Sequence, residues 1–202
     1  MPRPRTQDRT QIIARAMEQF WQHGFAASSM DDLVKATGST RHTIYTEFCG
    51  KERLFEDCLV AYSGAIVTPA FAQVETPAAR ISDIGAYFEH QIALAEKVGL
   101  PGPGCLMANT MTETAPHSAR AGALVHAHNE RLRAGFERAL LHSVPAPARS
   151  AARRRKCRDH ARALVVFASG LWSVSRLTPH ASDLRDSTGA FLHAIEHDLC
   201  AD

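Results

Sequence analysis

The 202-residue sequence has little net charge, no long apolar run and no cysteines paired as C-x-x-C. A formal net charge of +2 indicates no particular class of charged partner. The longest apolar runs are far too short to cross a bilayer, and no signal-like apolar segment follows the basic first residues. We therefore expect a cytoplasmic protein with no membrane partner.

The five cysteines are odd in number, widely spaced and not preceded by a secretory signal. This pattern favours reduced thiols over a disulfide framework. The absence of a C-x-x-C pair argues against a zinc finger and against a thioredoxin-type site. We expect no cofactor and no bound metal.

Alternation of apolar and polar residues, the mark of a strand, is also missing, and nearly every segment has helical periodicity. Glycine and proline divide the helical segments, most firmly in GLPGPG at residues 99–104. The sequence predicts an all-α fold with a small N-terminal domain, residues 1–55, and a second helical domain, residues 56–202. Helices of the second domain are expected over about residues 78–98, 116–142, 149–177 and 181–199.

The first 55 residues predict three short helices joined by tight turns. The first helix carries its apolar residues one to two turns apart between Thr10 and His23. Ser29 and Asp32 form the capping-box pattern of the second helix, and Thr40 is placed to cap the third. This succession is the order of a helix-turn-helix domain.

The third predicted helix has one apolar and one polar face. It buries Ile44 and Phe48, which are one turn apart, and turns hydroxyl, imidazole, phenol and guanidinium groups outward. Such groups donate to phosphates and to base edges in a major groove. Taken alone, the same face also fits an ordinary solvated helix surface.

The stretch from Ile12 to Phe55 resembles the DNA-binding domain of TetR/AcrR-type transcriptional repressors. The resemblance is carried by A-x-x-x-F-x-x-x-G-F from Ala16, D-L-V-K-A-T-G from Asp32 and T-I-Y-x-x-F-x-x-K-E-x-L-F from Thr43. It implies contacts with double-stranded DNA at seven positions. These are Thr40, Arg41, His42, Thr43, Tyr45, Thr46 and Lys51.

Three positions depart from the family pattern. His42 stands where a small residue is usual, Ser39 replaces an apolar residue at the turn, and Cys49–Gly50 replace the usual pair before the lysine. An imidazole is bulky and titrates near neutral pH. These changes affect the expected operator sequence more than the DNA-binding role.

The same resemblance implies that the C-terminal helices bind a small-molecule inducer and that the last two helices form a homodimer. Their apolar stripes equally fit a core within one chain. Within PGPGCLMANT, residues Gly104 to Asn109 are similar to a Gly-Cys-Leu-x-x-Asn segment that a subset of the family carries, and in some of those proteins the cysteine senses oxidants or electrophiles. A thiol at a helix N-terminus suits such a role, and a small buried residue suits plain packing. The expected ligand-binding or sensing residues are Phe88, Cys105, Asn109, Glu113 and Trp172.

Three further groups of residues have two interpretations each. Arg3 and Arg5 fit a basic arm on the DNA backbone and also a plain terminal tail. HAIEH at His193–His197 matches a zinc-peptidase pattern but also fits a solvent-facing helix side. The basic run at residues 149–162 fits polyanion binding or a solvated face.

Together these patterns predict a ligand-responsive DNA-binding transcriptional regulator, a repressor that leaves a near-palindromic operator when a small organic molecule, an oxidant or an electrophile acts on it. It is not expected to be an enzyme. The alternatives are a thiol enzyme using Cys105, a metal-dependent hydrolase using the C-terminal histidines, and a helical interaction module.

Overall fold

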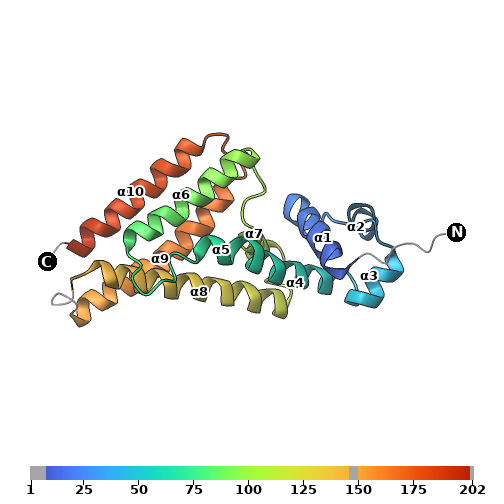
Figure 1. The fold of residues 1–202 in the computed structure, drawn as a ribbon, viewed down its shortest axis with the longest axis horizontal. Helices are drawn as coiled ribbons and strands as arrows, with labels where there is room; N and C mark the ends of the chain where they lie inside the picture. Colours follow the sequence, from blue (N-terminus) through green and yellow to red (C-terminus); the bar gives the residue numbers. More distant parts are fainter. Residues whose placement is uncertain (1–7, 146–149, 201–202) are drawn as a thin grey trace. The chain divides into compact units, whose positions relative to one another are not determined.

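The structure is a computed structural model that describes residues 8–145 and 150–200. These residues contain helices and no β-strand, which confirms the predicted all-α class (Figure 1). Arg3 and Arg5, the predicted basic arm, lie outside the described residues. In chain order the helical elements are α1 (Arg9–His23), α2 (Met30–Thr37), α3 (Arg41–Phe48), α4 (Lys51–Tyr62), the π-helical turn η1 (Ser63–Val67), α5 (Thr68–Phe71), α6 (Ile81–Val98), α7 (Leu106–Glu113), α8 (Ala119–Ser143), α9 (Ala151–Val174) and α10 (Ala181–Cys200).

The described residues form two compact units. Unit 1 contains residues 8–65 and 106–125, and unit 2 contains residues 66–105 and 126–200. Helix α8 therefore contributes its first residues to unit 1 and the remainder to unit 2. Because these units describe compactness within one chain, and not independent folding, the predicted domain boundary at residue 55 stays a prediction.

Unit 1 has a core formed mainly by α1 and α4. The apolar residues of α1 recur at helical spacing, so Ile12, Ala16 and Phe20 are all buried. Phe20 meets Phe55 of α4 edge to face, with ring centroids 5.0 Å apart. Complete burial of one such ring contributes about 1.5–3 kcal/mol to folding. Helices α2 and α3 pack beside this pair, so that the three short predicted helices are all present.

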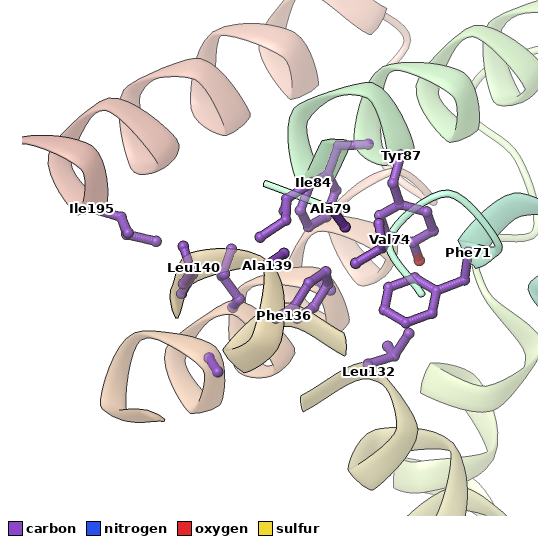
Figure 2. Packing of buried hydrophobic residues seen from close by; sticks show 14 of the residues in the cluster. Phe71, Val74, Ala79, Ile84, Tyr87, Leu132, Phe136, Ala139, Leu140 and Ile195 are labelled. Carbon is purple, nitrogen blue, oxygen red and sulfur yellow. The ribbon is translucent and has the colours of Figure 1, made fainter. Parts of the chain in front are cut away.

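Unit 2 has a larger apolar core to which α6, α8, α9 and α10 all contribute. Figure 2 shows how its side chains interlock, with the Phe71 ring among them. Phe71 lies edge to face with both Tyr87 and Phe136, at centroid distances of 5.2 and 5.3 Å. On the surface, Arg185 of α10 joins α6 by ion pairs with two of its glutamates.

One helical stretch among the described residues, Lys51–Phe71, is long and apolar enough to cross a membrane when length and composition alone are considered. Its mean hydropathy is 1.2, and the stretch joins α4, η1 and α5, although each uninterrupted apolar run within it is short. Its Leu54 and Phe55 are buried in unit 1, while Glu56 forms an ion pair with Arg53. Burial of one apolar face with ion pairs on the other is the arrangement of a helix in a protein core.

Candidate nucleic-acid interface

Helix α2 has a defined cap at each end, and the cap at its start is the one that the sequence predicts. The Ser29 backbone N–H donates to Asp32 Oδ2 at 2.9 Å, and the Asp32 N–H donates to Ser29 Oγ at 3.2 Å. The Ser29 hydroxyl also donates to Asp32 Oδ2, at 2.6 Å, and this bond, followed by the one from the Ser29 backbone N–H, lowers the pKa of the Asp32 carboxyl. Helix α2 ends at Gly38, whose φ of 68° is left-handed. The capping box confirms the predicted start of the second helix.

Helix α3 turns its predicted polar face outward. Ile44 and Phe48 are buried, at 0% and 1% exposure, while Tyr45 is 55% exposed. Arg41, His42 and Thr46 are also exposed, and Thr43 is half-buried. The five candidate contact residues on α3 therefore lie on a face that no other part of unit 1 covers completely.

The hydroxyl groups of this face are already ordered by bonds within the helix. Thr40 caps α3, because the Thr43 backbone N–H donates to Thr40 Oγ1 at 3.1 Å, and the two hydroxyl oxygens are 2.9 Å apart. The Thr46 hydroxyl donates to the His42 carbonyl oxygen at 3.0 Å. The Thr46 hydroxyl oxygen can still accept, and one hydroxyl hydrogen of the Thr40–Thr43 pair is not used between them, so the face can accept as well as donate.

Arg41 is tied to α2 by an ion pair that sequence reasoning missed. Its Nη2 lies 2.7 Å from Asp31 Oδ1, and its Nε lies 3.2 Å from the same atom. This hydrogen bond raises the pKa of the guanidinium. Both side chains are exposed, so the pair itself adds little stability. Its effect is to orient the guanidinium, and a phosphate must share its donors with Asp31.

Lys51 begins α4 beside a turn that has no side-chain cap. Gly50 is the N-cap residue, with φ 119°, so the first N–H groups of the helix receive no capping hydrogen bond from its side chain. Such an N-terminus attracts anions through its N–H groups and the helix dipole. The Lys51 Nζ lies 4.3 Å from the centre of the Phe25 ring, a cation–π contact.

Glu113, expected at the ligand site, has its carboxylate at the turn between α1 and α2 in unit 1. Its Oε2 accepts the Phe25 backbone N–H at 3.1 Å, and its Oε1 accepts the Ala26 N–H at 2.8 Å. These partners lie 88 and 87 residues away in sequence, so no local pattern signals the contact. Asn109, on the same helix, is half-buried, and its carbonyl oxygen accepts the Thr112 hydroxyl at 3.0 Å.

Phe88, Cys105 and Trp172 all belong to unit 2. The Phe88 and Trp172 rings are stacked with centroids 6.5 Å apart, and Cys105 packs against the same apolar core. Sequence reasoning missed Tyr87, which neighbours Phe88 and is 5% exposed. Burial raises the pKa of the Tyr87 phenol, the Cys105 thiol adds to this, and a hydrogen bond with Trp172 opposes it. These contacts place the tyrosine beside the cysteine and the tryptophan.

The segment that carries Cys105 is held close to α9 by a glycine. Gly104 has φ 70°, and a β-carbon at this position would lie 2.6 Å from the Trp172 carbonyl oxygen. Only glycine fits such a close approach of two backbones. All five cysteines are described, and none of them forms a disulfide.

The two remaining sequence patterns have structural explanations within unit 2. His193 and His197 are exposed, and the described residues contain no cluster of three His, Cys, Asp or Glu able to hold a metal. In the basic run, Lys156 and His160 both bind the Asp198 carboxylate of α10, at 3.0 and 2.8 Å. These two bonds lower the pKa of that carboxyl, with the His160 bond first. This part of the run fastens α9 to the end of α10.

The chain is similar to one protein-family model, to two curated proteins in sequence and to several solved structures in fold. The family model for bacterial regulatory proteins of the tetR family matches residues 12–58. The HTH-type transcriptional repressor ComR of Escherichia coli (strain K12) is 35% identical over 116 residues, which are 57% of this chain and 55% of ComR. The matched region thus spans little more than half of ComR. The uncharacterized HTH-type transcriptional regulator YezE of Bacillus subtilis (strain 168) is 23% identical over 142 residues, 70% of this chain and 72% of YezE.

Solved structures of similar fold cover nearly the whole chain. A cysteine mutant of the TetR family transcriptional regulator CifR, complexed with 26-base-pair operator DNA, has a TM-score of 0.79 at 21% identity and covers 95% of this chain and 99% of that one. A TetR transcriptional regulator from Chloroflexus aurantiacus J-10-FL has a TM-score of 0.74 at 19% identity, covering 93% of each chain. At these identities the likeness establishes the fold. Residues 12–58 therefore match the N-terminal domain of the tetR family of bacterial regulatory proteins, and the chain has the fold of these two regulators.

Proposed function

We propose that this protein is a cytoplasmic, homodimeric transcriptional repressor that binds double-stranded operator DNA and leaves it when an effector binds. The outward face of α3 carries the proposal. It presents Arg41, His42, Tyr45 and Thr46 to solvent on a helix whose other side is fully buried. The names of the relatives agree with this, since ComR is named a repressor and CifR was solved with operator DNA.

In the proposed complex, α3 enters the major groove and the start of α4 meets the phosphate backbone. Arg41 and His42 near the start of α3, with Tyr45 and Thr46, supply base-edge and phosphate contacts. Lys51 and the first N–H groups of α4 supply a phosphate contact. A two-fold dimer places two copies of α3 in successive grooves about 34–36 Å apart, so the operator is a near-palindrome.

The proposed dimer surface lies on α9 and α10 of unit 2. Val166, Gly170 and Val174 lie close together around the α9 axis, and Leu177 lies in the turn that follows; the apolar members of this stripe are 53–82% exposed. A groove of about 560 Å³ between α9 and α10 runs beside this stripe. An exposed apolar stripe of this kind suits burial against a second copy of the chain, because a two-fold dimer brings the same patch of both copies together.

We place the effector site at the aromatic side chains around Phe88, Tyr87 and Trp172, beside Cys105. Aromatic walls with a few polar groups suit a small organic molecule. Release follows if the effector binds a conformation with the wrong α3 spacing more tightly than the DNA-bound one. We propose no catalytic activity for the protein.

A gel shift with duplexes from the DNA upstream of its own gene tests the proposal. The wild type is expected to bind a near-palindrome with an affinity that falls steeply as salt rises. Changing Thr43, Tyr45 and Lys51 together to Ala should weaken binding at least a hundredfold, because this variant removes side chains that face base edges and phosphates alike. Unchanged binding by this triple variant would reject the DNA-binding role of α3.

The same gel shift, with an alkylating agent added to the bound complex, separates the two interpretations of Cys105. Release of the wild type but not of Cys105→Ser indicates sensing by the thiol. Equal release of both proteins eliminates that cysteine as the sensor and leaves packing as its role.

A further inference from the structure

The carboxylate of Glu113 holds the turn that connects the first two helices of the DNA-binding region. Each carboxylate oxygen accepts one backbone N–H, Oε2 from Phe25 at 3.1 Å and Oε1 from Ala26 at 2.8 Å. Both bonds are charge-assisted, which makes them stronger than bonds between neutral groups. Helix α7, which ends at Glu113, is thereby fixed to a turn that lies far away in the sequence.

The turn has the shape that a carboxylate requires. Gly24 ends α1 with φ 85°, after which the next two N–H groups both reach Glu113. A β-carbon on Gly24 would lie 3.1 Å from Glu113 Oε2, so the missing side chain leaves room for the carboxylate. Glycine at this position therefore serves both the backbone conformation and the contact.

The Phe25 ring connects this turn to Lys51. The ring packs against Phe20 and Phe55, with centroid distances of 6.0 and 4.9 Å. It also contacts the Lys51 ammonium, which lies 4.3 Å from the ring centre. The residue whose N–H is held by Glu113 is thus the residue whose ring holds the lysine that begins α4.

We propose that Glu113 is a positioning residue for DNA binding: by fixing Phe25 it holds the Lys51 ammonium at the start of α4, where the operator phosphate is bound. The inference rests on the proposed function, since it assigns Lys51 a phosphate. A positioning role and the charge of Glu113 predict opposite effects of its removal on DNA binding. A carboxylate repels DNA, so its removal should tighten binding if charge alone acted. If Glu113 positions Lys51, its removal weakens binding.

The test compares full-length variants by fluorescence anisotropy with the same operator duplex over a range of KCl concentrations. Glu113→Ala should bind about tenfold more weakly at moderate salt, with a log K against log salt slope lower by about 0.9 for each phosphate that the variant no longer neutralises. The matched control is Glu18→Gln, an exposed acid of α1 whose removal changes the net charge by the same amount. It should bind as wild type or slightly more tightly.

A double-variant comparison identifies the route through Lys51. Lys51→Ala should show the same decrease of slope, and adding Glu113→Ala to it should weaken binding little further. Phe25→Leu keeps the backbone hydrogen bond to Glu113 but removes the ring, so it should also lower the salt slope. This variant replaces Glu113→Ala in the test if Glu113→Ala fails to fold. In Glu113→Gln without DNA, hydrogen exchange at the Phe25 and Ala26 amides should accelerate.

The possible failures are distinguishable. If the wild type binds no duplex at any salt concentration, the proposed function itself is rejected. If the wild type binds and the Glu113 variants keep its affinity and slope, only the positioning role is rejected. Weaker binding with an unchanged slope, of equal size in the Lys51→Ala background, shows a purely structural role for the carboxylate and also overturns the inference.

Discussion

At the scale of single residues, His128 on α8 makes the stability of the protein depend on pH. Burial lowers its pKa from 6.5 to about 4, with a smaller contribution from the charge of Arg131. Its Nδ1 is buried and has no hydrogen-bond partner among the described residues. The folded protein therefore keeps this imidazole neutral under conditions in which the unfolded chain protonates it.

The sign of this effect follows from proton uptake. Between pH 6.5 and about 4 the unfolded chain binds a proton at His128 that the folded chain does not, so acid favours unfolding. The stability that the neutral His128 contributes to the folded protein is complete above pH 6.5. It is lost as the pH falls toward 4, by at most about 1.4 kcal/mol per pH unit. Urea unfolding at pH 7, 5.5 and 4.5 should show a smaller loss of stability for His128→Gln than for the wild type. Parallel losses in both proteins would assign the acid sensitivity to other groups.

Individual side chains also show where sequence reasoning ends. Ile44 and Phe48 could be placed inside from spacing alone, because helical periodicity decides which face is buried. The ion pair of Arg41 with Asp31 and the hydrogen bond from Phe25 to Glu113 could not be predicted in this way. Both join different elements, and their geometry depends on how those elements pack.

At the scale of elements, the junction between α3 and α4 is a two-residue turn built from unusual backbone angles. Cys49 ends α3 with φ 59°, the one positive φ at a non-glycine residue in the described part of the chain, and Gly50 follows with φ 119°. A left-handed conformation costs an L-residue about 1–2 kcal/mol. Cys49 and Gly50, which depart from the family pattern, therefore still form a turn between the two helices, and the backbone of Cys49 is strained.

Replacing Cys49 by glycine should relieve that strain. The side chain is exposed, so its removal disturbs little packing, and Cys49→Gly should raise the free energy of unfolding by about 0.5–1 kcal/mol after the greater freedom of glycine in the unfolded chain is counted. Glu47→Gly, at an exposed site within α3, should instead lower it by a similar amount. Urea midpoints of the two variants measure both effects, and a lower midpoint for Cys49→Gly would contradict the strain at this turn.

Element boundaries were predictable where local capping decides them and less so elsewhere. Ser29 and Thr40 cap α2 and α3 as the sequence indicates. The helix expected from Pro116 instead begins at Ala119, because residues 114–117 form a turn and the Ser118 hydroxyl oxygen accepts the Ala121 N–H at 3.2 Å. Residues 63–67, directly after α4, form a π-helical turn, which no local residue pattern indicates.

At the scale of the whole molecule, a net charge of +2 is too small to determine the proposed affinity for DNA. That affinity depends instead on where the charges lie and on how many binding surfaces act together. In the proposed complex, one copy of α3 contacts a single half-site. Two copies linked in the proposed dimer gain from a high effective concentration of the second copy once the first is bound. The proposed dimer surface on α9 and α10 is therefore as important for operator affinity as the side chains of α3.

Charge introduced into that surface should separate the two copies. In Val166→Arg the guanidinium would be buried without a partner in the dimer, and such burial is costly. Sedimentation should then show a single chain, and operator affinity should fall about a hundredfold or more while binding to an isolated half-site is kept. Val98→Arg is the matched control, since Val98 is 70% exposed against 74% for Val166 but lies on α6 and is not one of the stripe residues. A dimer that survives Val166→Arg, or one that is lost equally in Val98→Arg, would move the interface away from the exposed stripe of α9.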